Sequence, residues 1–122
     1  MLLCKVGNKS KIFSVKLELM NIADVLGDER EFEISVDGQV FFYESMFPIL
    51  ELAQYCQKWI NDRNSDFIYN TVESDENPLI AFNRVEGGWK LESVWREFEC
   101  KKVFSETDVI NFVNKIIHQV TH

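Results

Sequence analysis

The chain has few basic residues and no long apolar run, and each deficit excludes a class of function. Its 122 residues carry 13 Lys and Arg against 20 Asp and Glu, a net charge of −7. This balance argues against general binding to nucleic acid or to an anionic membrane, since both require Lys and Arg. No apolar stretch approaches the roughly 18 residues of a transmembrane helix, and the N-terminus lacks the apolar run of a secretory signal. We therefore expect a cytoplasmic protein that contacts neither nucleic acid nor membrane.

Cysteine and histidine are also scarce, and their spacing argues against a metal site. The three cysteines, Cys4, Cys56 and Cys100, are far apart and odd in number, which fits neither a disulfide framework nor a zinc-binding pattern. We expect reduced thiols, with Cys56 in the core. His118 and His122 would share one face of a helix, as two metal ligands on a helix must, but no carboxylate stands between them. We therefore predict no bound metal.

Sequence motifs that carry catalysis are missing as well. The chain has no Gly-x-Ser-x-Gly sequence, in which a nucleophilic serine sits on a sharp turn, and no Gly-x-Gly sequence that could cradle a phosphate. We predict a protein that is not an enzyme and binds no cofactor. Two alternatives stay open: a small metal-binding enzyme that uses His118 and His122, and a small-molecule binding module lined by Phe and Trp side chains.

Apolar residues spaced three and four apart predict two helices. The first runs from Pro48, a residue tolerated in a first helical turn, to Asn61. The second begins at Ser105, where Asp108 three residues later gives a start like a capping box. The two apolar stripes are Ile49, Leu52, Ala53, Cys56, Trp59 and Ile60, and then Val109, Ile110, Phe112, Val113, Ile116, Ile117 and Val120. Each stripe is typical of a helix that packs on a core.

Six further segments are typical of strands, because polar and apolar residues alternate in them or turn residues bound them. They are residues 11–20, 32–36, 39–43, 67–73, 79–85 and 89–98. Asp37-Gly38, between the second and the third, is a strong hairpin signal. The connections are short, which favours antiparallel pairing. We therefore predict one α+β domain over residues 1–122, with an antiparallel β-sheet of about six strands and two helices packed on one face.

Acidic residues concentrate between residues 66 and 99. This segment holds eight acidic and three basic residues, so most of the net charge lies there. Such a run commonly forms a solvated face that keeps a small domain soluble. It can also form an electrostatic docking surface, which raises the association rate with a basic partner. Under the second interpretation the acidic contact residues are Glu73, Asp75, Glu76 and Glu86.

Two tryptophans, Trp89 and Trp95, stand six residues apart on one predicted strand. The even spacing places both side chains on the same face of that strand. If a helix covers the face, the two indoles belong to the core, and if the face is open, they are anchors for a partner. Arg and Lys do not alternate with them, which disfavours a stacking platform for single-stranded nucleic acid.

Several short runs are similar to one group of known proteins. They are Phe32-Glu-Ile-Ser-Val-Asp-Gly, Phe47-Pro-Ile-Leu-Glu-Leu-Ala, Trp59-Ile, Asp66-Phe-Ile-Tyr, Pro78-Leu-Ile-Ala-Phe, and Gly88-Trp with Ser93-Val-Trp. Over residues 20–100 these runs resemble a family of small bacterial proteins, some of which look like immunity proteins of polymorphic or contact-dependent toxin systems. The resemblance implies a protein that binds and blocks a cognate toxin domain, and it brings no catalytic motif.

These observations together predict an immunity protein whose partner is a basic nuclease domain of a contact-dependent growth inhibition or polymorphic toxin system. A nuclease must present Lys and Arg to phosphates, so an acidic surface that imitates the charge of the substrate is attracted to the same site. Occupying that site excludes the nucleic acid without any chemistry. The expected partner contacts are Glu73, Asp75, Glu76 and Glu86, with Trp89 or Trp95 as anchors.

Overall fold

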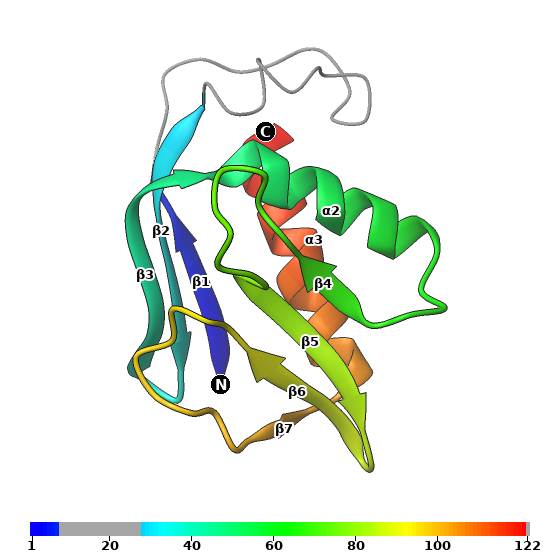
Figure 1. Cartoon of the computed structure of the whole chain (residues 1–122). Coiled ribbons are helices and arrows are strands. Elements are labelled where there is room, and N and C mark those ends of the chain that lie inside the picture. Colours follow the sequence, from blue (N-terminus) through cyan, green and yellow to red (C-terminus); the bar gives the residue numbers. More distant parts are fainter. Residues whose placement is uncertain (8–27, 122) are drawn as a thin grey trace.

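The computed structural model describes residues 1–7 and 28–121, which form seven strands and two helices (Figure 1). The strands are β1 (Leu2–Val6), β2 (Glu29–Val36), β3 (Gln39–Pro48), β4 (Phe67–Tyr69), β5 (Ile80–Val85), β6 (Gly88–Glu92) and β7 (Val103–Phe104). The helices are α2 (Ile49–Asn61) and α3 (Glu106–Thr121). All strand pairs are antiparallel, so the predicted α+β class is confirmed. The strand predicted over residues 11–20 lies outside the described residues.

Both helices lie where the apolar periodicity places them. α2 begins directly after Pro48 and buries one stripe of apolar residues from Ile49 to Trp59. The start of α3 is a reciprocal cap, as the sequence predicts. The Ser105 hydroxyl accepts a hydrogen bond from the Asp108 N–H at 3.1 Å, and the Asp108 carboxylate accepts one from the Ser105 N–H at 3.2 Å. These local signals suffice to fix where each helix begins.

Glycines set two of the turns between strands. Asp37 and Gly38 both have positive φ, 51° and 85°, which is the backbone conformation of a tight hairpin between β2 and β3. This confirms the predicted hairpin. Gly88, at the start of β6, has a φ of 155°, and a Cβ atom there would clash with the carbonyl oxygen of Phe104. Only glycine therefore lets β7 approach β6 this closely.

The strands form two sheets, of order β1-β2-β3 and β4-β5-β6-β7, instead of the single predicted sheet. The physical reason is the connection: β3 continues directly into α2, and the helix carries the chain away from the first sheet before β4 begins. The predicted strand over residues 89–98 is also shorter, since β6 ends at Glu92. The chain then crosses to the edge of β3, where the Glu97 N–H donates a hydrogen bond to the Phe41 carbonyl at 2.8 Å.

The core lies where the two sheets and the two helices meet. α2 contacts β2 and β4, α3 contacts β1 and β6, and the helices pack against each other. The fully buried aromatic residues are Phe32, Phe41, Phe42, Phe47, Phe67, Tyr69, Phe82 and Phe104. All three cysteines are free and buried, as predicted for Cys56. Neither described helix combines the length and the apolar character that crossing a membrane requires.

Candidate functional site

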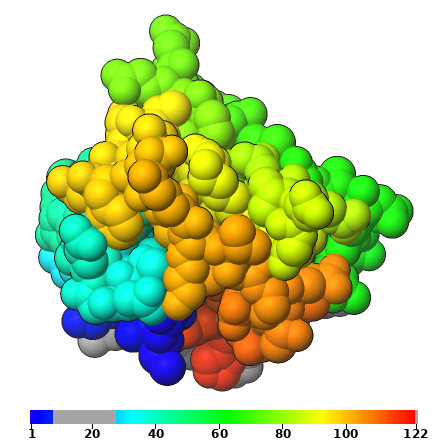
Figure 2. All heavy atoms as spheres, turned by 90° about the horizontal axis from the view of Figure 1, so that it is seen from below, coloured from blue at the N-terminus to red at the C-terminus, as the bar shows by residue number. Residues whose placement is uncertain are grey.

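The predicted acidic residues do not form one group. Glu73, Asp75 and Glu76 are exposed in the segment between β4 and β5, whereas Glu86 lies in the turn between β5 and β6. The length of β5, six residues or about 20 Å, separates that turn from the other three. In Figure 2 the segment 70–79, in light green, projects from the molecule beside the yellow segment that follows β6. Glu86 therefore belongs to a different surface.

Trp89 is a core residue, so the prediction that it could anchor a partner is wrong. Its side chain is only 4% exposed. The indole packs edge-on against Trp59, with ring centroids 5.7 Å apart, and the guanidinium of Arg84 lies 4.9 Å from its ring centroid. Because β6 ends at Glu92, Trp89 and Trp95 do not share a strand face, which removes the premise of their pairing.

Trp95 lies at the surface and contacts one of the predicted acidic residues, Glu76. Its side chain is 37% exposed, and its indole N–H donates a hydrogen bond to the Glu76 carboxylate at 2.7 Å. The turn that carries it is tied to the β4–β5 segment by a hydrogen bond from the Val94 N–H to the Pro78 carbonyl at 3.1 Å. The structure thus brings Trp95 together with Glu76 across 19 positions of sequence.

A cleft of about 240 Å³ opens beside Trp95, and we call it the acidic cleft. Three segments line it: the end of β3 with Glu44, Met46, Phe47 and Pro48, the β4–β5 segment with Thr71, Glu73, Ser74 and Leu79, and the turn with Trp95. Met46 is 67% exposed at its margin. The cleft therefore combines exposed apolar side chains with carboxylates, the anatomy of a protein-binding surface with an apolar centre and a polar rim.

Hydrogen bonds hold the β4–β5 segment in one shape. The Asn77 side chain accepts a bond from the Thr71 N–H at 2.8 Å and donates to the carbonyls of Thr71 and Ser74 at 3.2 and 2.8 Å. The Thr71 hydroxyl accepts from the Glu73 N–H at 3.2 Å. A surface that is already ordered loses less conformational entropy when a partner binds.

Beside the cleft lies a buried carboxylate that sequence analysis missed. Glu51, in the first turn of α2, is only 4% exposed. It accepts hydrogen bonds from the Tyr69 hydroxyl at 2.6 Å and from the Val72 N–H at 3.4 Å. Burial, followed by the hydrogen bond to Glu51 and then by the charge of Glu51, raises the pKa of Tyr69 well above its ordinary value. Glu51 thus fixes the start of the β4–β5 segment against α2.

Negative charge accumulates in the acidic cleft without a compensating cation. Partial desolvation raises the pKa of the Glu73 carboxyl, and the neighbouring charges of Glu29 and Glu51 raise it further. No Lys or Arg is among the described residues that line the cleft. Arg96, next to Trp95 in sequence, lies 3.7 Å from the Glu92 carboxylate instead. A cationic group bound in the cleft would therefore reduce the electrostatic repulsion between these carboxylates.

Residues 6–122 match the family described as a domain of unknown function (DUF7878). The chain belongs to this family. No curated protein and no solved structure is significantly similar to it. The match spans every described helix and strand except β1, of which it includes only Val6, and the acidic cleft lies wholly inside the matched region.

Two of the three buried cysteines in this DUF7878 chain have raised pKa values. Burial raises the pKa of Cys4 to about 11 and that of Cys56 well above its ordinary value, so both thiols are protonated at neutral pH. Within residues 1–7 and 28–121, no three His, Cys, Asp or Glu side chains are grouped to hold a metal ion. His118 is exposed on α3, and His122 lies outside the described residues.

Sequence reasoning found Glu73, Glu76 and Trp95 but missed Glu44 and Met46. The found residues stand in a run of acids or carry a large aromatic group, and both properties are visible in the sequence. Glu44 and Met46 sit at the end of a strand, with no local pattern that marks them. They reach the cleft because β3 ends against the β4–β5 segment, which only the tertiary structure shows.

Proposed function

We propose that this DUF7878 chain is an immunity protein, a non-catalytic inhibitor that binds a cationic toxin domain through the acidic cleft. The toxin is a nuclease of a contact-dependent growth inhibition or polymorphic toxin system, and binding occludes its active site. One observation carries the proposal: the cleft places the exposed side chains of Trp95 and Met46 among carboxylates, with no Lys or Arg among its described lining residues.

The chemistry of a nuclease site matches this surface. A nuclease presents Lys and Arg to the phosphates of its substrate. Glu44 and Glu73 line the cleft from two different segments, so a cationic group bound in the cleft lies near both acidic residues. The exposed indole of Trp95 adds a π-face on which an Arg or Lys can rest. Trp and Met are enriched at protein interfaces, and Trp is frequent among the residues that dominate binding energy.

The acidic character of the whole chain supports the same function. A net charge of −7 attracts a basic partner over several ångströms and speeds the encounter. The same charge repels nucleic acid, so the inhibitor does not compete for the substrate of its target. Affinity would then depend on the short-range contacts of the acidic cleft, and the overall charge would act mainly on the association rate.

A matched pair of charge reversals tests the proposal. Glu73→Lys changes a carboxylate in the acidic cleft, and Glu86→Lys makes the same change in total charge at the far end of β5. The measured quantity is the rate of association with a candidate basic toxin domain, one encoded by a gene adjacent to that of this chain, by stopped flow at low and high salt. We expect Glu73→Lys to slow association about tenfold at low salt and Glu86→Lys to change it less than about twofold.

The binding test has a cellular counterpart. Co-expression of the chain with the neighbouring toxin domain should restore growth, and Trp95→Ala combined with Glu73→Lys should abolish the protection in a chain that still folds cooperatively. Equal association rates for the two charge reversals would refute the assignment of the acidic cleft. A neighbouring toxin domain that never forms a complex with the chain would refute the proposed function itself.

A further inference from the structure

The acidic cleft is smaller than an ordinary small-molecule site. Its volume is about 240 Å³, whereas sites for free small molecules enclose roughly 300 to 1,000 Å³. Among the residues that the structure describes, no three His, Cys, Asp or Glu side chains are grouped to hold a metal ion. A cleft of this size suits one side chain that projects from a larger partner.

The residues that line the acidic cleft are of two main kinds. No Lys or Arg is among the described lining residues. The apolar ones are Met46, Phe47, Pro48, Leu79 and Trp95, and the carboxylates are Glu44 and Glu73. An occupant that matches both kinds has an apolar stem and a cationic end, and this combination is found in Lys and Arg.

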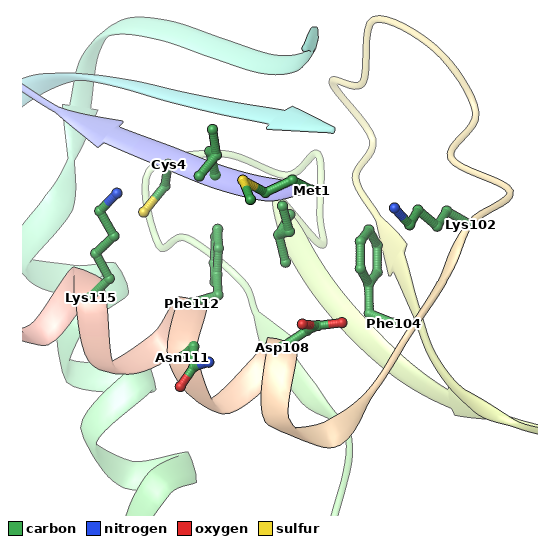
Figure 3. Close-up of a pocket in the computed structure, with 10 residues that line it drawn as sticks. Met1, Cys4, Lys102, Phe104, Asp108, Asn111, Phe112 and Lys115 are labelled. Carbon is green, nitrogen blue, oxygen red and sulfur yellow. The ribbon is translucent and has the colours of Figure 1, made fainter. Parts of the chain in front are cut away.

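A second and larger concavity has the opposite charge. It lies between β1, β7 and α3 and has a volume of about 460 Å³. In Figure 3 Lys102 and Lys115 stand at its opposite ends, and Asp108 is the one acid among its described lining residues. A cationic side chain is therefore disfavoured there. Because the two hollows share no lining residue, the larger one serves as an internal control.

Trp95 offers a partner the face of its ring and not its N–H. The indole N–H is already donated to the Glu76 carboxylate at 2.7 Å, and this bond fixes how the ring is turned. The side chain nevertheless stays partly exposed and lines the acidic cleft. The face of an indole is the aromatic surface that attracts a cation most strongly, and a planar guanidinium can also stack on it.

The chain itself contains an example of this contact. The guanidinium of Arg84 lies 4.9 Å from the ring centroid of Trp89, and it also donates a hydrogen bond to the Arg63 carbonyl at 2.7 Å. One guanidinium can therefore contact an indole and hydrogen-bond at the same time. The ammonium of Lys is more strongly hydrated and has no planar face, so it gains less from the same surroundings. This difference favours Arg over Lys as the occupant of the acidic cleft.

The two carboxylates add to the match with a guanidinium. The Glu44 carboxylate accepts a hydrogen bond from the Met46 N–H at 3.2 Å, which holds it at the margin of the cleft. The charges of Glu29 and Glu51 act unfavourably on the charge of Glu73, and a cation beside Glu73 offsets that repulsion. A guanidinium has five N–H donors, so it can bond to more than one acceptor.

We propose that the acidic cleft is a pocket for one arginine side chain of the partner protein, with the guanidinium against Trp95 and beside the Glu73 carboxylate. This inference rests on the proposed function, since it names the side chain through which a basic toxin domain is recognised. It adds a specificity that charge alone does not give: a lysine in the same place binds more weakly, although its charge is the same.

NMR on the full chain with defined peptides tests the proposal without any toxin. The probe is acetyl-Gly-Gly-Arg-Gly-Gly-amide, and in two control peptides Lys or citrulline, which has the shape of Arg but no charge, replaces the Arg. The Trp95 indole N–H signal reports on the cleft, and those of the buried Trp59 and Trp89 are references. We expect the Arg peptide to shift only the Trp95 signal, with a Kd on the order of 1 mM. The Lys peptide should bind about threefold more weakly or worse, and the citrulline peptide should not bind.

Matched variants separate the charge from the aromatic face. Glu73→Gln should weaken binding of the Arg peptide about threefold or more, whereas Glu86→Gln, the same change on another surface, should not alter it. When Trp95 is replaced, the methyl signal of Met46 reports binding. Trp95→Phe and Trp95→Leu both lose the bond to Glu76, but only Phe keeps an aromatic face, so Trp95→Leu should bind about twofold more weakly or worse. Unchanged Trp59 and Trp89 signals show that each variant is folded.

Each outcome supports or overturns the pocket. A saturable shift of Trp95 that weakens with Lys and disappears with citrulline supports it. Equal binding of the Arg and Lys peptides overturns it, as do equal effects of Glu73→Gln and Glu86→Gln, or no saturation up to about 50 mM peptide. A shift of the Lys102 and Lys115 amides in place of Trp95 overturns it too.

The pocket and the proposed function fail in different experiments. A toxin complex that forms although the Arg peptide does not bind would refute the arginine pocket and leave the immunity function standing. Binding of the Arg peptide by a chain that never forms a complex with the toxin domain would refute the immunity function and leave the pocket standing.

Discussion

The buried hydrogen bond between Tyr69 and Glu51 is the contact whose removal should cost the most stability near the acidic cleft. Tyr69 is fully buried and Glu51 is 4% exposed, and their oxygens are 2.6 Å apart. A buried hydrogen bond to a charged group contributes about 2 kcal/mol. Among the described residues, Tyr69→Phe leaves the Val72 N–H, at 3.4 Å, as the remaining hydrogen-bond donor to the carboxylate. We therefore expect Tyr69→Phe to lower the free energy of unfolding by about 2 kcal/mol, and the Tm by roughly 8 °C.

A double-mutant cycle makes this expectation specific to the pair. Glu51→Leu leaves the buried Tyr69 hydroxyl without its acceptor and should also cost about 2 kcal/mol, but in the double variant neither side chain keeps an unpaired buried polar group, and the N–H of exposed Val72 can bond to water. Its cost should therefore fall below the sum of the single costs by at least about 1 kcal/mol. The assay is urea denaturation followed by tryptophan fluorescence, with m-values compared to confirm that the same transition is measured.

The chain supplies a matched control for the tyrosine change. The Tyr43 hydroxyl donates to the Glu31 carboxylate at 2.9 Å, the same chemistry on an exposed surface. Water replaces that bond when it is lost, so Tyr43→Phe should cost less than about 0.5 kcal/mol. Additive costs in the Tyr69 and Glu51 cycle, or equal costs for the buried and the exposed tyrosine, would refute the reasoning.

Three further predictions follow from the same structure. Because the pKa of Glu73 is raised in the folded state, the folded chain binds this proton more tightly than the unfolded chain, and it loses stability as the pH rises through the pKa of this carboxyl. Glu73→Gln should therefore be more stable than wild type at pH 7 by a few tenths of a kcal/mol. Below about pH 4 the same denaturation assay should show no difference. Trp95→Ala should change the free energy of unfolding by less than about 1 kcal/mol but weaken toxin binding. Trp89→Ala should lower the free energy of unfolding by about 3 kcal/mol or more, because it leaves a cavity in the core. Calorimetry of both variants tests this, and a larger loss of stability for Trp95→Ala than for Trp89→Ala would contradict it. All three cysteines are buried, so a thiol reagent should label them only as fast as the chain unfolds, and rapid labelling of Cys4 in native conditions would contradict its burial and raised pKa.

Elements with a strong local pattern were predictable from the sequence. The helix over 48–61 matches α2 within one residue, and the reciprocal Ser105 and Asp108 bonds occur as the capping pattern implies. The Asp37-Gly38 turn also forms as expected. Each of these features depends on residues within about four positions, and the free energy that selects them is local. The α+β class follows directly from the order of such elements.

The short strands were not predictable in this way. β1 has five residues and β7 has two, and neither alternates clearly enough to stand out. Strands this short are stabilised by the neighbours with which they pair and not by their own composition. β1 pairs with β2 across a long stretch of sequence, from Leu2 to Val36 at one end. β7 depends on the glycine at position 88. The sequence shows this glycine, but it does not show that the backbone of Phe104 approaches it closely.

By itself, the sequence determined the acidic charge, the positions of both helices and the tight hairpin, because these depend on composition and on contacts between near neighbours. Only the tertiary structure determined which of the acidic residues and tryptophans are buried and which are exposed, and which of them lie together. It buried Trp89, exposed Trp95 beside Glu76, carried Glu86 to another surface and enclosed Glu51. The reason is physical: burial and charge repulsion depend on which distant segments of the chain meet. The pattern of neighbouring residues in the sequence does not show which segments meet.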